Sequence, residues 1–343
     1  MTRESLKERY SRQILFSGIG VAGQKRLSTG RVALVGCGAT GSAVASLLAR
    51  AGVGYLRIID RDYVETSNLQ RQSLFDEKDA AESMPKAVAA AKKISTFNSE
   101  ISADPRVDDV APSNIHLLLE GVDVIIDGTD NYETRYLIND YALEHGSPWI
   151  YAAAVGSYGA TMNVVPDETA CLACIFPESP GGMGETCDTS GILNSAVNLV
   201  ASIAATEAIK LLVGGDALNK LRKSLWAFDV WTNDQSEISA RTPNPHCRAC
   251  GKRDFVHLAG KETPHITLCG RNAVQIHERA RPIDFAEMRQ RLQVHGTVRH
   301  NEFVLKFWRD PYELTLFPDG RAIIKGTTDT GVARSLYARF VGS

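Results

Sequence analysis

The 343-residue sequence predicts an α/β fold with a doubly wound, mostly parallel sheet. Residues 32–60 combine an apolar strand, a glycine turn, a helix and a second apolar strand that ends in an acid. Apolar strands and helices go on alternating to about residue 155, which is the pattern of parallel βαβ units. Gly36, Gly38 and Gly41 have the G-x-G-x-x-G spacing of Rossmann-like nucleotide-binding turns.

Three regions are expected along the chain: a helical lead-in over residues 1–30, a main α/β domain over 31–253 and a small α+β extension over 254–343. After Asp60 we predict a polar loop at residues 61–75 and a helix at 84–98. A buried strand at 122–131, a second helix at 132–146 and a strand at 148–155 follow. Further on, residues 191–215 form a long apolar helix, buried in the protomer or in a dimer interface. Strands follow at 223–239, and the extension holds a strand, a helix, a meander with a Pro-Asp-Gly turn and a last helix.

Composition narrows the class of protein. The formal net charge of −2 gives no reason to expect bulk binding to nucleic acid or to a membrane. The charged start lacks the apolar run of a signal peptide, and no run of about 18 apolar residues is present. We therefore expect a cytoplasmic protein, in which seven cysteines indicate metal or thiol chemistry and not disulfides.

The glycine turn predicts a nucleotide site, with phosphates at the N-terminus of the following helix and Asp60 at a ribose. Taken alone, this pattern favours a nicotinamide- or flavin-dependent oxidoreductase. Arg71, Lys86 and Arg12 could instead converge with Asp130 on the turn. Cations beside a carboxylate suited to Mg²⁺ are what transfer at phosphorus requires. Each also has a structural interpretation, as surface charge or as a turn or helix-cap residue.

Two C-x-x-C pairs, Cys171 with Cys174 and Cys247 with Cys250, predict a structural zinc site. Because residues 175–246 separate the pairs, the metal would join two distant segments of the chain. Four thiolates leave no coordination position for water, so this zinc would hold structure and not carry out chemistry.

A set of motifs over residues 9–251 resembles the ThiF/MoeB/HesA family, relatives of the ubiquitin-activating enzymes. The matching pieces are RYSRQILFSGIGVAGQKRL, GCGATG, AGVGYLRIIDRDYVETSNLQRQ, Pro85-Lys86, IIDGTDN, both C-x-x-C pairs, ETCDTSGIL and the ATEAIKLL helix. The resemblance implies a homodimer that binds Mg²⁺ and ATP. It also implies that each protomer adenylates the C-terminal glycine of a ubiquitin-fold sulfur carrier similar to ThiS or MoaD, which ends in Gly-Gly, and releases pyrophosphate.

The resemblance also assigns residues. Four parts of the chain would hold the nucleotide: the glycine turn, the acid expected at the ribose, the polar loop and the start of the next helix. Their residues are Gly38, Ala39, Asp60, Ser67, Asn68, Arg71 and Lys86. Asp130 with Asn131 would lie near the magnesium ion, and Arg12 would reach the nucleotide across the dimer. Many members have glycine where this chain has Ala39, but the backbone N–H is the binding group there.

Cys187 matches the position of a reactive cysteine in several relatives and could form a thioester or an acyl-disulfide. Otherwise it is a dispensable thiol, and a separate cysteine desulfurase or sulfurtransferase completes the chemistry. The eight histidines show no metal-binding spacing. The extension would dock the carrier or the dimer. Two alternatives remain: an oxidoreductase, which needs neither Arg71 nor Lys86, and a nucleotide-regulated zinc protein without catalysis.

Overall fold

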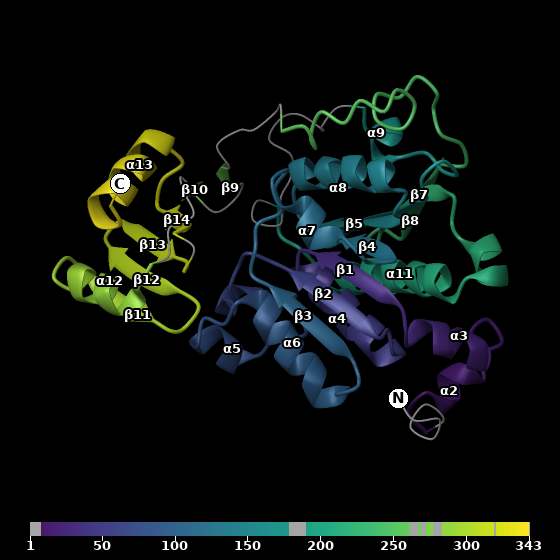
Figure 1. Ribbon diagram of the computed structural model, residues 1–343, viewed down its shortest axis with the longest axis horizontal. Helices are drawn as coiled ribbons and strands as arrows, with labels where there is room; N and C mark the ends of the chain where they lie inside the picture. Colours follow the sequence, from purple (N-terminus) through teal and green to yellow (C-terminus); the bar gives the residue numbers. More distant parts are fainter. Residues whose placement is uncertain are drawn as a thin grey trace. The chain divides into compact units, whose positions relative to one another are not determined.

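The structure, a computed structural model, describes residues 8–177, 190–260, 267–268, 272–276, 283–318 and 320–342. The chain divides near residue 262 into two compact units. The first unit contains a large sheet with helices on both faces, and the second is a smaller sheet with two helices (Figure 1).

The first unit is built on an eight-stranded sheet of order β3-β2-β1-β4-β5-β6-β7-β8. Strands β3, β2, β1, β4 and β5 run parallel, and β6, β7 and β8 continue the sheet by antiparallel pairing. The parallel half confirms the doubly wound prediction, while the other half is an antiparallel meander. The strands are β1 Arg31–Val35, β2 Tyr55–Ile59, β3 Ser102–Arg106, β4 Val124–Asp127, β5 Trp149–Val155, β6 Tyr158–Val164, β7 Ser224–Asp229 and β8 Asp234–Ser239.

Strand β3 belongs to the parallel half, but the sequence pattern did not predict it. Its segment, SADPR, contains Pro105 and has no fully buried residue. β3 pairs only with β2, at the edge of the sheet, where proline is tolerated because one side of the strand needs no hydrogen bonds. An exposed, polar edge strand lacks the apolar run by which β1 and β4 are recognised.

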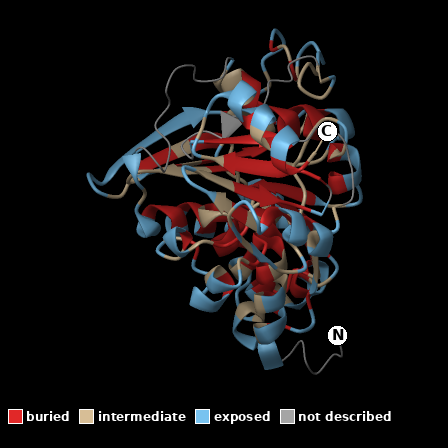
Figure 2. Ribbon diagram, turned by 90° about the vertical axis from the view of Figure 1, so that its left-hand side faces the viewer, coloured by how far each residue is buried: buried red, intermediate tan, exposed pale blue. Residues whose placement is uncertain are grey.

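Helices cover both faces of this sheet. Helices α4 (Ala39–Ala51), α6 (Lys86–Phe97) and α11 (Asn194–Val213) pack on one face, and α7 (Ile115–Leu119) and α8 (Tyr132–His145) on the other (Figure 1). The strands between the two layers are mostly buried (Figure 2). Between the α7/α8 layer and the sheet, a continuous apolar cluster includes Ile59, Ile115, Tyr136 and Trp149.

Helix α11 lies against α4, β5 and β6, and its buried residues are mainly alanine and valine. Its length and composition would suffice to cross a membrane, but half of its most apolar window is buried inside the protein. The outward face is more polar than predicted, because it carries Asn198, Ser202 and Thr206. Each of these side chains donates to a carbonyl of the preceding turn. The predicted burial is therefore confirmed for one face, as expected for a core helix.

The described part of the lead-in contains the short helices α2 (Ser11–Ile14) and α3 (Gly20–Leu27), which are separated by glycine-containing turns. Both helices are tied to the C-terminal end of α4. The Gln13 and Gln24 side-chain amides donate to the Ala51 carbonyl at 2.8 and 3.0 Å. The lead-in is thus anchored at the end of α4 that lies farthest from the glycine turn.

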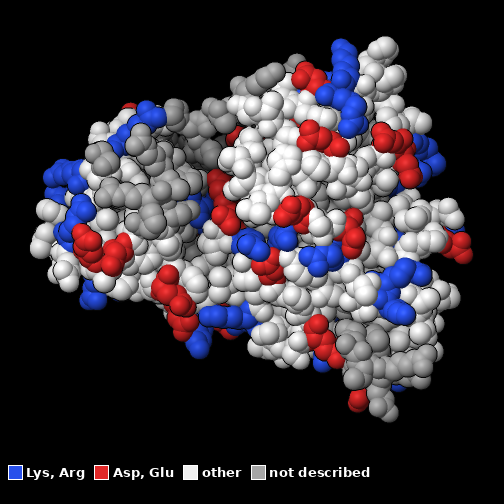
Figure 3. Space-filling model, in the orientation of Figure 1, with Lys and Arg blue, Asp and Glu red and all other residues white. Residues whose placement is uncertain are grey.

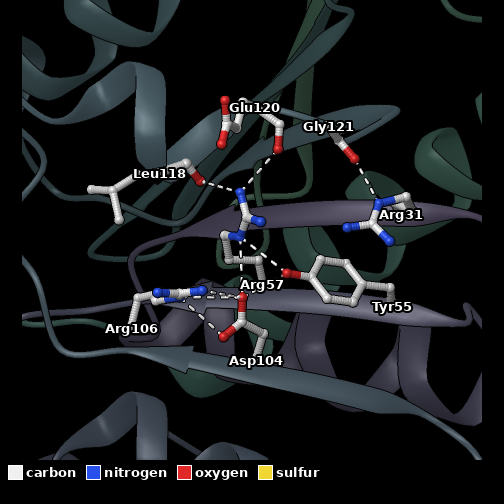
Figure 4. A network of polar contacts seen from close by, with 8 residues as sticks. All are labelled: Arg31, Tyr55, Arg57, Asp104, Arg106, Leu118, Glu120 and Gly121. Atoms are coloured by element: carbon white, nitrogen blue, oxygen red, sulfur yellow. Dashed lines mark hydrogen bonds and ion pairs between the residues drawn. The ribbon is translucent and has the colours of Figure 1, made fainter.

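A polar network joins β2, β3 and the segment that leads from α7 into β4 (Figure 4). Arg57, on β2, donates to the Leu118 and Glu120 carbonyls and pairs with Asp104 on β3 at 3.2 Å. The Tyr55 hydroxyl donates to the same carboxylate at 2.6 Å. Because Arg57 is only 8% exposed, these bonds satisfy a cation that would otherwise be costly to bury.

The second unit has a six-stranded antiparallel sheet of order β11-β12-β13-β14-β10-β9, with α12 (Phe285–Leu292) and α13 (Thr330–Phe340). Its core includes Leu305, Phe307 and Phe340. The predicted meander corresponds to β12, β13 and β14, and Asp319 of the expected turn lies outside the described residues. The strands are β9 Thr267–Leu268, β10 Ala273–Ile276, β11 Thr297–His300, β12 Leu305–Arg309, β13 Tyr312–Leu316 and β14 Ala322–Lys325.

Candidate functional site

The glycine turn connects β1 to α4 through a backbone contact that only glycine permits. Gly36 has a φ of +87°, and a Cβ there would lie 2.7 Å from the Gly128 carbonyl oxygen. A Cβ on Gly41 would lie 2.0 Å from the Gly36 oxygen, and one on Gly128 would lie 2.4 Å from that oxygen. The turns after β1 and β4 are therefore pressed together backbone to backbone, which brings the residues after Gly128 beside the nucleotide turn.

Helix α4 begins directly after Gly38, which has no side chain to bond the amides of the first turn. Those amides and the helix dipole make this terminus suited to an anion. Ala39 is the first helical residue and offers its backbone N–H, so the absence of a glycine there removes no donor.

Asp60 follows β2 and is held in the turn by two backbone amides. Its carboxylate accepts from Cys37 N at 2.6 Å and from Asp62 N at 2.7 Å. Burial raises the pKa of Asp60, and the nearby Lys86 charge opposes that rise. The side chain is thus fixed at the end of β2, where a ribose would lie in a nucleotide site of this class.

Lys86 is the first residue of α6 and is almost fully buried. Its Nζ lies 3.0 Å from Asp62 Oδ2, and its backbone N–H donates to the Asp62 carbonyl. This geometry removes the interpretation of Lys86 as a solvated surface charge. Asp62, which the sequence analysis did not single out, fixes the lysine beside Asp60.

The polar loop after β2 is ordered by its own side chains. Asn68, in the short 3₁₀ helix Thr66–Asn68, is buried and bonds the Glu65 N–H in a capping box. Arg71 Nη1 donates to the Ser67 carbonyl at 2.8 Å, and the Ser67 side chain is exposed. The buried Asn68 amide therefore shapes the loop, whereas Ser67 and Arg71 lie at its surface.

Gln72 is a candidate that the sequence analysis missed. It is 3% exposed, and within the described residues its Oε1 has no hydrogen-bond partner. Its Nε2 would be 4.0 Å from a Cβ at Gly38, the nearest atom to that position. A buried, half-satisfied amide beside the phosphate-binding turn is suited to a ligand. In the sequence, its position four residues after Asn68, within a polar loop, was the feature that could have indicated a ligand-binding role.

Asp130 lies in the turn after β4, on a rigid frame. Asp127 ends β4 fully buried; it pairs with Arg135 Nε at 2.9 Å and accepts from the Thr129 amide and hydroxyl. Burial raises the pKa of Asp127, and the Arg135 charge opposes this rise. Asn131 caps α8 by accepting from Thr134 N at 2.8 Å, which leaves Asp130 exposed between two anchored neighbours.

The structure does not bring every predicted residue together. Arg12 is exposed on α2, next to Gln13, whose side chain bonds Ala51 at the opposite end of α4 from Gly38. It lies far from the nucleotide turn of its own chain, because a 13-residue helix is about 20 Å long. Cys187 lies outside the described residues.

The four predicted metal ligands meet in one cluster, and all four sulfurs lie within 4.8 Å of one another. Cys171 Sγ is 3.8 Å from Cys174 Sγ and 3.7 Å from Cys247 Sγ, and Cys174 Sγ is 3.3 Å from Cys250 Sγ. Thiolates bound to a tetrahedral zinc at about 2.3 Å are about 3.8 Å apart, so the cluster fits such an ion. Cys171 precedes the short helix α9 (Leu172–Ile175), and amides after Cys247 fold back onto its carbonyl.

These features define an α/β protein with a glycine turn of the nucleotide-binding type and a separate four-cysteine cluster that could hold a metal ion. The chain belongs to the ThiF family, whose model matches residues 10–249. It is 43% identical over 338 residues to the sulfur carrier protein ThiS adenylyltransferase of Bacillus subtilis, covering 97% of this chain and 99% of the relative. It is 39% identical to the SAMP-activating enzyme E1 of Haloferax volcanii, covering 71% of this chain and 89% of that protein.

Among solved structures, Escherichia coli MccB in complex with ATP has the same fold. The TM-score is 0.62 at 24% identity, over 71% of this chain and 74% of MccB. The alignment with the Bacillus subtilis protein extends beyond residue 249, so it includes residues of the second unit.

Proposed function

We propose that this protein is an ATP-dependent adenylyltransferase that activates the C-terminal glycine carboxylate of a ubiquitin-fold sulfur-carrier protein. The observation that carries the proposal is the 43% identity to a ThiS adenylyltransferase over nearly the whole of both chains. The geometry supports it, because the backbone of Gly128, two residues before Asp130, contacts the glycine turn, and the Lys86 charge acts on Asp60. A hydride-transfer site has little use for such a carboxylate, so the oxidoreductase alternative is disfavoured.

In the proposed reaction, a carboxylate oxygen of the carrier attacks the α-phosphorus of ATP. The bond from that phosphorus to the oxygen bridging it to the β-phosphorus breaks, and pyrophosphate leaves with the electron pair. The α4 amides and Lys86 hold the phosphates and offset charge as it moves onto the leaving group. A magnesium ion held by Asp130 would neutralise phosphate charge, and Asp60 would orient the ribose.

The second partner in the proposal is another copy of this chain. Arg12 lies at the far end of α4 from the nucleotide turn of its own chain, so it can contact ATP only on a neighbouring protomer. Arginine suits that role because its planar fork matches phosphate oxygens. Mixing Arg12→Ala and Lys86→Ala proteins tests this arrangement, since one mixed dimer site would contain both native residues. Activity that does not rise on mixing would contradict it.

ATP–pyrophosphate exchange tests the reaction, with ThiS-like and MoaD-like carriers ending in Gly-Gly. We expect carrier-dependent exchange that Asp130→Ala reduces at least 100-fold. Asp216→Ala, at an exposed site in the 3₁₀ helix Gly215–Lys220, is the matched control and should keep full exchange. No exchange with any carrier would overturn the proposal, and the carrier that works would identify thiamine, molybdopterin or another thiolation pathway.

We propose that the Cys187 thiolate attacks the carbonyl carbon of the acyl adenylate, which breaks the bond from that carbon to the phosphate oxygen, releases AMP and leaves a thioester. A cysteine desulfurase or sulfurtransferase would be the sulfur source. The Cys187→Ala protein should keep pyrophosphate exchange and lose any covalent adduct with the carrier. A mass spectrum that retains the adduct in this variant would exclude Cys187 as the acceptor of the acyl group.

On the face shown in Figure 3, basic and acidic side chains are interspersed, so the described residues of that face form no single-sign patch.

A further inference from the structure

Helices α7 and α8 bring together two histidines that are far apart in the sequence. His116 lies in the first turn of α7, and His145 is the last residue of α8. One ligand atom each of His116, Glu144 and His145 lies within 4.8 Å of the others, and all three side chains are exposed. We propose that this triad binds a divalent transition-metal ion such as Ni²⁺, Zn²⁺ or Cu²⁺, separately from the four-cysteine site.

The donor set is chemically suited to such ions. Two imidazoles with one carboxylate favour borderline transition metals over Mg²⁺ or Ca²⁺, which prefer oxygen ligands. Three ligands from the protein leave positions for water on an exposed ion. An ion pair between Glu144 Oε2 and His145 Nδ1, which are 3.5 Å apart, would explain why these two members of the triad lie close together. It would not account for His116, which comes from another helix.

Contacts with Tyr141 hold both imidazoles in place without a metal. The His145 ring stacks on the Tyr141 ring at 4.2 Å, and His145 Nδ1 is 3.0 Å from the Tyr141 carbonyl oxygen. A carbonyl only accepts, so in the neutral ring Nδ1 would carry the hydrogen and the free lone pair would lie on Nε2. His116 packs edge-on against both rings, with centroids 5.4 Å from Tyr141 and 5.0 Å from His145.

The local charges favour a cation. His145 ends α8, where the helix dipole presents its negative end. Glu144 adds a carboxylate within the triad itself, which supplies further negative charge to attract the ion.

This site is distant from the proposed chemistry. Asn131 caps the opposite end of α8, and a 14-residue helix is about 21 Å long. A metal here would not touch the nucleotide. It would join α7 to the end of α8 and so stabilise the layer to which Arg57 donates through the Leu118 and Glu120 carbonyls.

Nickel binding tests the proposal on the full chain with its four-cysteine site already loaded with zinc. Calorimetric titration with NiCl₂ and metal analysis after gel filtration should show one nickel ion per wild-type chain. His116→Ala and His145→Ala should lose that ion, and Glu144→Gln should weaken binding at least tenfold. His300→Ala, at an exposed histidine of the second unit, is the matched control and should bind nickel as wild type does.

A second measurement separates metal binding from damage to the fold. Nickel should raise the melting temperature of the wild type and of His300→Ala, and leave that of His116→Ala unchanged. Since His116 is exposed, its variant should melt at the wild-type temperature without metal. Equal nickel content in the wild type and in His116→Ala, or no bound nickel in the wild type, would overturn the proposal.

Discussion

Lys86 Nζ and Asp62 Oδ2 form a nearly buried ion pair, 3.0 Å apart, immediately beside Asp60. The lysine lies at the start of α6, and the two acids lie just beyond the end of β2. The pair therefore links the two segments between which the polar loop runs. It also places a positive charge close to a carboxylate whose pKa burial raises.

We predict that Lys86→Met lowers both nucleotide affinity and stability. Two carboxylates lose their cation, and breaking a buried pair by removing one partner costs roughly 3–5 kcal/mol. Urea unfolding and ATP binding by calorimetry measure the two effects. Lys92→Met, at an exposed position of the same helix, is the control and should change neither. An unchanged affinity for ATP in Lys86→Met would exclude a role for Lys86 at the phosphates.

The glycine turn provides a pair of substitutions with opposite outcomes. In Gly41→Ala the new Cβ would lie 2.0 Å from the backbone oxygen of Gly36, which no side-chain movement can relieve. We expect a loss of about 3 kcal/mol or more, or no folded protein. In Gly38→Ala the nearest atom is Gln72 Nε2 at 4.0 Å, so stability should fall by less than about 1 kcal/mol. Equal losses measured by urea unfolding would contradict the backbone packing.

Removing one thiolate tests the metal site. Cys250→Ser should abolish zinc binding at the four-cysteine site. It should also lower the melting temperature by about 10 °C or more, because a structural zinc contributes several kcal/mol to folding and 1 kcal/mol corresponds to roughly 2–4 °C in large domains. Cys37→Ala, at a buried thiol outside the cluster, should retain zinc. Metal analysis by mass spectrometry decides the result. A Cys250→Ser protein with full zinc content would show that the four sulfurs do not act together.

Asp140 makes stability depend on pH. Burial raises its pKa to about 6, against attraction by Arg248 and a bond from the His257 amide. The native state therefore binds this proton more tightly than the unfolded state, so its contribution to stability falls as pH rises from about 4 to 6. Well above pH 6, the ionised Asp140 lowers the free energy of unfolding by about 3 kcal/mol relative to low pH.

Asp140→Asn should therefore gain stability relative to wild type as the pH rises over this interval. Urea unfolding at pH 4, 5, 6 and 7 measures the difference, and comparison at each pH cancels other titrations. Asp216→Asn, at an exposed carboxylate, should show a difference from wild type that is independent of pH. If the stability difference between Asp140→Asn and wild type were also independent of pH, the raised pKa of Asp140 would be disproved.

The sequence predicts the parts of the fold that depend on local pattern. Glycine spacing identifies the β1–α4 turn, and two C-x-x-C pairs identify a four-cysteine cluster formed across residues 175–246. It misses β3, because a polar edge strand containing Pro105 has no apolar run. Gln72 and the pairing of His116 with His145 depend on which segments the fold brings side by side, and spacing does not encode that.

The four-cysteine cluster also changes the topology of the chain. Cys174 and Cys247 are separated by residues 175–246, so a bound metal closes that stretch into a ring. A protease cut within the ring would yield two fragments that remain tethered, both by the ion and by the sheet, in which β7 pairs with β6. Under denaturing conditions only the ion could hold the fragments together. The nicked chain should therefore separate more readily with chelator than without it, as with a disulfide-linked protein in reductant.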